Sequence, residues 1–231
     1  MKIGIIGAGM IGGTLTRRLR ALGHEVAVAN SRGAETLKEL AAETGAKAVE
    51  ARAAPRGADL VVVTIPERAV RELPEGLLAG LPADVPVVDT GNYYPRQRDG
   101  RIEEIEAGLP ESRWVERQLG RPVLKAFNMI YARDLLERGR PQGSPERLAL
   151  PVAGDDGAAK AVVMRLIDEL GFDPVDAGGL DESWRQQPGT PVYGARLDAA
   201  GVQRALAAAK RERPPEFSGS AASPGSFESP A

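Results

Sequence analysis

Cysteine is absent from the 231-residue chain, and histidine occurs once, as His24. Without cysteine there is no disulfide scaffold, no thiolate metal site and no cysteine nucleophile. A single histidine leaves almost no material for Ser–His catalysis or for a multi-histidine metal site. We therefore expect no metal site in this protein.

An excess of charge of one sign is also lacking, because 30 Lys and Arg residues stand against 32 Asp and Glu residues. This near-balance argues against a general nucleic-acid binder, which is usually basic. No stretch reaches the roughly 18 apolar residues of a membrane span, and the first residues lack the pattern of a signal peptide. We expect a cytoplasmic protein with neither a membrane nor a nucleic-acid partner.

Short apolar runs alternate with segments of helical spacing. Strands are predicted at residues 2–6, 25–29, 59–65, 85–89 and 123–127, with weaker candidates at 148–153 and 173–176. Helices are predicted at 11–22, 34–44, 67–73, 75–79, 158–170 and 198–211. This alternation predicts an α/β fold, namely a Rossmann-type doubly wound, mostly parallel sheet with a small C-terminal extension.

A glycine-rich turn joins the first predicted strand to the first predicted helix. The motif G-x-G-x-x-G is formed by Gly7, Gly9 and Gly12. In this context Gly7 allows the tight turn, Gly9 lets the backbone approach a pyrophosphate, and Gly12 lets helix and strand pack closely. The pyrophosphate then lies on N–H groups at the positive end of the helix. The motif predicts dinucleotide binding, and the alternative is an ordinary glycine turn.

The end of the second predicted strand indicates which dinucleotide is bound. NAD sites usually place a carboxylate there to hold the ribose hydroxyls, but this chain has Asn30-Ser31-Arg32 and no carboxylate before Glu35. Ser31 can donate a hydrogen bond, and Arg32 can pair with a 2′-phosphate or stack on adenine. The pattern therefore favours NADP as the cofactor, and the alternative is that Arg32 is one more surface arginine.

Polar residues follow the later predicted strands, where ligands bind in this architecture. Asn92 and Asn128 end two of these strands and can both donate to and accept from a carboxamide or a substrate. Asn128 is the candidate catalytic residue, although asparagine is also common in ordinary turns. Tyr93 and its neighbour Tyr94 are candidate donors on the substrate side, with packing as the alternative.

Four stretches of sequence carry a family resemblance. They are KIGIIGAGMIGGTLTRRL at 2–19, Asn30-Ser31-Arg32, VVVTIPERAV at 61–70 and LPVAGDDGAAKAVVMRLIDELGFDPVDAGGL at 150–180. Together they resemble the coenzyme F420-dependent NADP oxidoreductase family over about residues 1–180. The last stretch is long and specific, whereas the first fits many dehydrogenases.

The resemblance implies a homodimer that binds NADP and passes a hydride between the nicotinamide and the deazaflavin ring of coenzyme F420. It assigns the 2′-phosphate to Ser31 and Arg32. It also implies that the other contacts to NADP come from the glycine turn and from the segment after the third long strand, which are Gly9, Met10, Ile11, Ile65, Pro66 and Val70.

Beyond Leu180 the similarity to the family ends, and the family's proline is replaced by Gly179. Trp184 could stack on a flat ring and Arg185 could hold polar groups, or the loop could simply pack over the domain edge. We predict three parts: an NADP-binding domain at 1–180, a C-terminal loop and helix at 181–213, and a disordered tail at 214–231, whose Pro, Ser and Gly content lacks periodicity.

Three functions remain open at this point. The first is an NADP-dependent oxidoreductase that acts on F420 or a similar flat acceptor. The second keeps NADP but reduces a small imine or carbonyl compound, because the 181–194 loop diverges from the family. The third is a non-catalytic NADP-binding sensor, because the sequence shows no clear catalytic acid.

Overall fold

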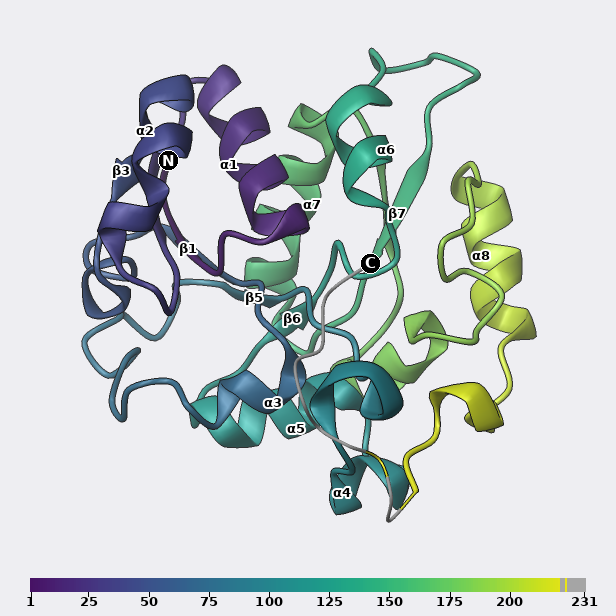
Figure 1. Cartoon of the computed structure of the whole chain (residues 1–231). Coiled ribbons are helices and arrows are strands. Elements are labelled where there is room, and N and C mark those ends of the chain that lie inside the picture. Colours follow the sequence, from purple (N-terminus) through teal and green to yellow (C-terminus); the bar gives the residue numbers. More distant parts are fainter. Residues whose placement is uncertain (221–222, 224–231) are drawn as a thin grey trace.

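The computed structural model describes residues 1–220 and residue 223 (Figure 1). A six-stranded sheet has the order β3-β2-β1-β4-β5-β6, and every pair of neighbouring strands is parallel. The strands are β1 Lys2–Ile6, β2 Glu25–Ala29, β3 Lys47–Ala48, β4 Leu60–Val63, β5 Val87–Asp89 and β6 Leu124–Lys125. This strand order is that of the dinucleotide-binding fold, so the predicted Rossmann-type architecture is confirmed.

Two further strands, β7 Ala149–Val152 and β8 Asp173–Asp176, form a separate parallel pair. An antiparallel bridge between Lys125 and Ala153 connects β6 to the residue that follows β7. The weaker strand candidates in this region are therefore correct, and they extend the fold beyond the main sheet.

Helices cover the sheet on both faces, as Figure 1 shows. They are α1 Met10–Ala21, α2 Lys38–Thr44, α3 Glu67–Val70, α4 Glu103–Glu106, α5 Glu111–Leu119, α6 Ala132–Glu137, α7 Gly157–Glu169 and α8 Ala199–Ala208. The start of α7 is capped by Asp156, whose carboxylate accepts hydrogen bonds from the N–H groups of Ala158 and Ala159. In the part of the chain that the structure describes, no helix is long and apolar enough to cross a membrane.

Strand β4 shows why the central strands are apolar throughout. Its residues Leu60 and Val62 belong to one hydrophobic cluster, whereas Val61 and Val63 belong to another. Successive side chains of a strand point to opposite faces, so this strand is buried on both sides. Each face of the sheet is therefore covered by an apolar layer of its own.

Several predicted boundaries are wrong. Residues 75–79 form turns rather than a helix, because Gly76 lies at φ 67° and interrupts helical geometry. The predicted helix 34–44 divides into the 3-10 helix Ala34–Leu37 and α2. The strands predicted at 85–89 and 123–127 are shorter, at Val87–Asp89 and Leu124–Lys125.

The segment after α8 returns to the insertion that separates β5 from β6, and the two lie together at the bottom of Figure 1. The N–H of Gly219 donates to Glu106 Oε1 at 2.6 Å, and Arg101 donates to the Gly219 carbonyl at 2.7 Å. Residues Pro215–Phe217 form a 3-10 turn, whereas the sequence predicted disorder from 214 onward. Residues 221–222 and 224–231 of that predicted tail lie outside the described residues.

Candidate functional site

The turn between β1 and α1 can only be built from glycine at two of its positions. Gly7 has φ 113°, a value that favours glycine. A Cβ atom on Gly12 would lie 2.0 Å from the carbonyl oxygen of Gly7, so helix and strand approach each other backbone to backbone. Both glycines therefore have the structural roles that the motif predicts.

Gly9 is different, because a Cβ atom there would meet no described atom within 4 Å. It lies just before α1, whose first turn contains no acidic residue and no side-chain cap. The next residue, Met10, is 71% exposed. An open backbone at the positive end of a 12-residue helix fits the pyrophosphate of a dinucleotide.

The turn after β2 presents Ser31 and Arg32, which are both exposed. Asn30 fixes this turn, because its Oδ1 accepts from the Arg32 N–H at 3.0 Å and its Nδ2 donates to Thr36 at 2.9 Å. Among the residues that the structure describes, the Arg32 guanidinium has no partner. Among the described residues, Glu50 is the only carboxylate that is hydrogen-bonded to this turn. It accepts from the Ala34 N–H at 3.2 Å.

At the end of β4, Ile65 and Pro66 are partly exposed, whereas Val70 is buried. Val70 packs in an apolar cluster with Tyr93 and Trp114. The three predicted cofactor contacts of this segment therefore have different surroundings. Ile65 and Pro66 lie at the edge of the sheet, whereas Val70 packs against the insertion.

Asn92 and Asn128 form a reciprocal pair across the ends of β5 and β6. Asn92 Nδ2 donates to the Asn128 carbonyl at 2.8 Å, and Asn128 Nδ2 donates to Asn92 Oδ1 at 3.0 Å. Gln186 holds Asn128 from the other side, through bonds of 2.7 and 3.0 Å. Phe127, just before Asn128, has φ 61°, a strained value for a bulky residue. The chain is therefore bent here to bring the two amides together.

The structure places Asn128, the predicted catalytic residue, inside a cluster of hydrogen-bonded amides. Its side chain is buried, and both amide hydrogens and the amide oxygen are already bonded within the protein. Asn128 therefore orients the amide of Asn92.

The two neighbouring tyrosines of the insertion also separate. Tyr93 is fully buried, its hydroxyl donates to Glu106 at 2.9 Å, and the same oxygen accepts from the Ile102 N–H at 2.8 Å. The hydroxyl of Tyr93, a predicted donor on the substrate side, is therefore bonded inside the insertion. Tyr94 instead directs its hydroxyl to that of Tyr193.

Trp184 and Arg185 lie together in the 3-10 helix Leu180–Gln186. The Arg185 guanidinium stacks 4.5 Å from the Trp184 ring centroid, donates to Glu182 at 2.6 Å and reaches the carbonyl of Leu206 at 3.2 Å. The polar atoms of Arg185 are therefore largely engaged with α8 and with its own turn, which is the packing alternative of the sequence prediction.

Beneath the strand ends lies a group of buried charges that the sequence prediction missed. Lys125, Glu67, Glu111 and Asp89 are all nearly inaccessible to solvent. Lys125 Nζ donates to Asp89 Oδ2 at 3.0 Å and to the Gly91 carbonyl at 2.6 Å, and the Gly91 N–H donates to Asp89 Oδ1 at 2.8 Å. These bonds clamp Gly91 on both sides and so position the backbone that precedes Asn92.

Burial and the neighbouring charge of Asp89 raise the pKa of Glu67 well above its usual range. Burial opposes a charge on Lys125, but the carboxylates of Asp89, Glu67 and Glu111 outweigh it and raise the pKa of Lys125. Neither Glu67 oxygen has a hydrogen-bond partner among the described residues. The signal that could have revealed this group is a lysine in the middle of the apolar run 123–127.

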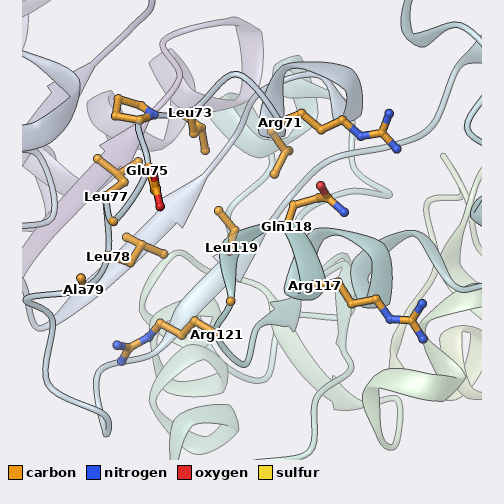
Figure 2. Close-up of a pocket in the computed structure, with 14 residues that line it drawn as sticks. Arg71, Leu73, Glu75, Leu77, Leu78, Ala79, Arg117, Gln118, Leu119 and Arg121 are labelled. Atoms are coloured by element: carbon orange, nitrogen blue, oxygen red, sulfur yellow. The ribbon is translucent and has the colours of Figure 1, made fainter.

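A hollow of about 600 Å³ lies elsewhere, between the segment after α3 and the end of α5 (Figure 2). Figure 2 shows Leu78 and Leu119 among its lining residues, with Arg117 and Arg121 pointing away to opposite sides. Arg121 donates to the carbonyls of Leu81 and Val85, just before β5 begins. The hollow therefore lies toward the amino ends of the strands, away from the edge where this architecture binds its ligands.

Comparison with known proteins relates this chain to a family of nicotinamide-dependent oxidoreductases. The sequence model of the family described as "NADP oxidoreductase coenzyme F420-dependent" matches residues 2–93. The hypothetical protein SMa0349 from Sinorhizobium meliloti, a solved structure, is 30% identical, with a TM-score of 0.71, and the match covers 85% of this chain and 95% of that one. The chain belongs to the F420-dependent NADP oxidoreductase family.

Two further proteins are similar to this family member. A protein of Arthrobacter sp. FB24, with a proposed identity as an F420-dependent NADP reductase, is 25% identical, with a TM-score of 0.62 and coverage of 78% of this chain and 86% of that one. YjhV of Escherichia coli (strain K12) is 46% identical over 91 residues, which are 39% of this chain and 59% of that protein.

The family model matches only the first part of the chain, residues 2–93. It includes the glycine turn, Arg32, Pro66 and Asn92, and it ends at Tyr93. Asn128, Trp184 and Tyr193 lie beyond it. The family match thus covers the glycine turn and the ends of β2, β4 and β5, but not the ends of the chain's later elements.

Proposed function

We propose that the protein is an NADP-dependent oxidoreductase that transfers a hydride between NADP(H) and coenzyme F420 or a similar flat acceptor. The observation that carries this proposal is the open Gly9 backbone at the start of α1, together with the exposed Ser31–Arg32 turn at the end of β2. The description of the family and that of the Arthrobacter protein support the same activity.

The residues have distinct roles in this proposal. The backbone of the glycine turn holds the pyrophosphate, Ser31 and Arg32 hold the 2′-phosphate, and a carboxylate that would repel this phosphate is absent from residues 30–34. When bound, the nicotinamide supplies or receives the hydride. Cofactor contacts are proposed for Gly7, Gly9, Met10, Ile11, Gly12, Ser31, Arg32, Ile65, Pro66 and Asn92.

The chain's own groups then orient the reacting partners. Lys125 and Asp89 fix Gly91, and Asn128 fixes the Asn92 amide. We further propose that residues 1–180 form the NADP-binding unit, that 181–213 close the substrate side, and that the active form is a cytoplasmic homodimer. Size-exclusion chromatography with light scattering tests the dimer.

The activity is tested with purified protein, NADPH and F420. Binding of NADPH is measured by its fluorescence, and reduction of F420 by loss of its visible absorbance band. Loss of this band at a rate proportional to the enzyme concentration supports the proposal. NADPH binding without loss of the band contradicts F420 as acceptor, and absence of NADPH binding contradicts the oxidoreductase function as a whole.

A second candidate function is reduction of a small imine or carbonyl compound with NADPH. One observation favours it: the Tyr94 and Tyr193 hydroxyls meet beside the Asn92 amide. Such acceptors need a proton as well as a hydride, and a tyrosine hydroxyl is a suitable donor.

A further inference from the structure

Two tyrosines from distant parts of the chain meet at the end of β5. Tyr94 lies in the insertion, two residues after Asn92, and Tyr193 lies in the loop after the 3-10 helix Leu180–Gln186. Their hydroxyls are in direct contact, and Asn92 Nδ2 lies 3.5 Å from the Tyr193 hydroxyl. Both side chains are half-buried. The pair is therefore set at the edge of the sheet where the ligand is proposed to bind.

The two hydroxyls and the Asn92 amide share a limited set of donors and acceptors. Asn92 faces Tyr193 with its amide nitrogen, because Asn92 Oδ1 is occupied by Asn128 Nδ2 at 3.0 Å. Tyr193 therefore receives a hydrogen from Asn92. The contact between the two hydroxyls uses one of their two protons, and the other has no acceptor among the described residues.

We propose that the Tyr94–Tyr193 pair is the proton donor to the acceptor, with Tyr193 as the catalytic residue, and that the acceptor is a compound with a C=O or C=N bond. This inference rests on the proposed NADPH-dependent function. The reduced nicotinamide gives its hydride to the carbon of that double bond, and the π electron pair moves to the oxygen or nitrogen. That atom takes the proton of Tyr193, which is replaced from Tyr94 and then from water.

The surroundings suit a donor of this kind. Burial raises the pKa of both Tyr94 and Tyr193, which keeps the pair protonated at neutral pH. The Arg98 guanidinium lies 5.3 Å from the Tyr94 ring centroid, and Glu111 and Tyr131 are further titratable neighbours among the described residues. Donation from Asn92 and Tyr94 to the Tyr193 oxygen stabilises the phenolate that is left after transfer.

The class of acceptor follows from where negative charge develops on the acceptor during hydride transfer. Hydride transfer to a carbonyl or imine leaves the negative charge on a single oxygen or nitrogen, so a proton is needed in the same step. In a deazaflavin the charge spreads over a conjugated ring, and the need for a positioned acid is smaller. Loss of the pair should therefore reduce turnover of an imine or ketone strongly and turnover of F420 weakly.

The test compares Tyr193→Phe and Tyr94→Phe with Tyr131→Phe, which removes an equivalent hydroxyl from a side chain that is 60% exposed. The probes are F420, 2-methyl-1-pyrroline and cyclohexanone, each with NADPH. For the imine or ketone we expect kcat to fall roughly 100-fold in Tyr193→Phe. We also expect the solvent deuterium isotope effect to disappear, and Tyr131→Phe to behave as the wild type.

A binding measurement separates proton donation from a structural role. We expect the Kd of 2-pyrrolidinone, a lactam that accepts the same hydrogen bond but is not reduced, to rise about tenfold in Tyr193→Phe but not in Tyr131→Phe. Equal kcat in Tyr193→Phe and the wild type overturns the inference, as does a wild type that reduces F420 but neither other probe. A wild type that binds NADPH and reduces none of the probes overturns the proposed function, and the inference with it.

Discussion

Lys125 Nζ lies 3.0 Å from Asp89 Oδ2 and 4.0 Å from Glu67 Oε1, and none of these three side chains is more than 2% exposed. Two acids thus share one cation in a buried layer next to Gly91. Removing one member of a buried ion pair leaves an uncompensated charge, which is far more costly than breaking a surface pair. The floor of the site thus depends on electrostatic balance as well as on packing.

Lys125→Met should lower the free energy of unfolding by about 3–5 kcal/mol, because Asp89 loses its cation in a buried position. Urea unfolding followed by circular dichroism measures this loss. Lys47→Met is the matched control, since the side chain of Lys47 is 76% exposed and pairs with Glu25 at 3.9 Å. Similar losses in the two variants would contradict the role of the buried pair.

Glu67 should make the protein less stable as the pH rises. Its pKa is raised by burial and by Asp89, so the folded state binds more protons than the unfolded state. The resulting loss of stability begins near the unfolded pKa of about 4.3 and grows up to the raised folded pKa. Glu67→Gln removes the titrating group, so we expect it to be more stabilising, relative to the wild type, at pH 8 than at pH 5.

Urea midpoints of both proteins at the two pH values test this prediction. The exposed Glu72, whose side chain is 66% accessible, supplies the control Glu72→Gln. An equal difference between Glu67→Gln and the wild type at pH 5 and pH 8 would show that Glu67 has an ordinary pKa.

Arg32→Ala should weaken NADPH binding about 10- to 100-fold, the effect of losing a charge-assisted hydrogen bond of roughly 1.5–3 kcal/mol. Binding of NADH, which lacks the 2′-phosphate, should change little. Fluorescence titrations with both nucleotides make the comparison. Arg133→Ala is the control, because the Arg133 side chain is 83% exposed and pairs within its own helix. A parallel loss of NADH affinity would argue against 2′-phosphate recognition.

Gly12→Ala and Gly9→Ala should fail in different ways. The new methyl group on residue 12 would meet the Gly7 carbonyl at 2.0 Å, so the fold should lose about 1–3 kcal/mol or more. At residue 9 the methyl group enters open space, so the melting temperature should hold while the Kd for NADPH rises. Thermal unfolding and NADPH titration of both variants distinguish these outcomes, and a destabilised Gly9→Ala would contradict an open cofactor surface.

The main features of the fold were accessible from sequence because they depend on neighbours along the chain. The apolar run at β4 and the helical spacing of α1 are local patterns, and the glycine turn lies between two such elements. Asn30, Ser31 and Arg32 likewise form a contiguous turn. Errors occurred where a single residue overrode local propensity, as Gly76 does in the predicted helix 75–79.

The remainder of the site depends on contacts between residues far apart in sequence. Asn92 meets Asn128 across 36 positions, and Tyr94 meets Tyr193 across 99. No local periodicity encodes such pairs. Tyr93 and Tyr94 are adjacent residues of the same type, so the sequence does not distinguish their roles. The fold directs the Tyr93 hydroxyl to Glu106 and the Tyr94 hydroxyl to Tyr193.

Glu106 Oε1 accepts from both the Tyr93 hydroxyl and the N–H of Gly219, which is 113 residues further along the chain. During synthesis, the acceptor and the first donor leave the ribosome long before the second donor exists. The sheet and the glycine turn can assemble from early residues, but the insertion completes its hydrogen bonding only after Gly219 has emerged. The insertion can therefore complete its structure only later in synthesis than the sheet and the glycine turn.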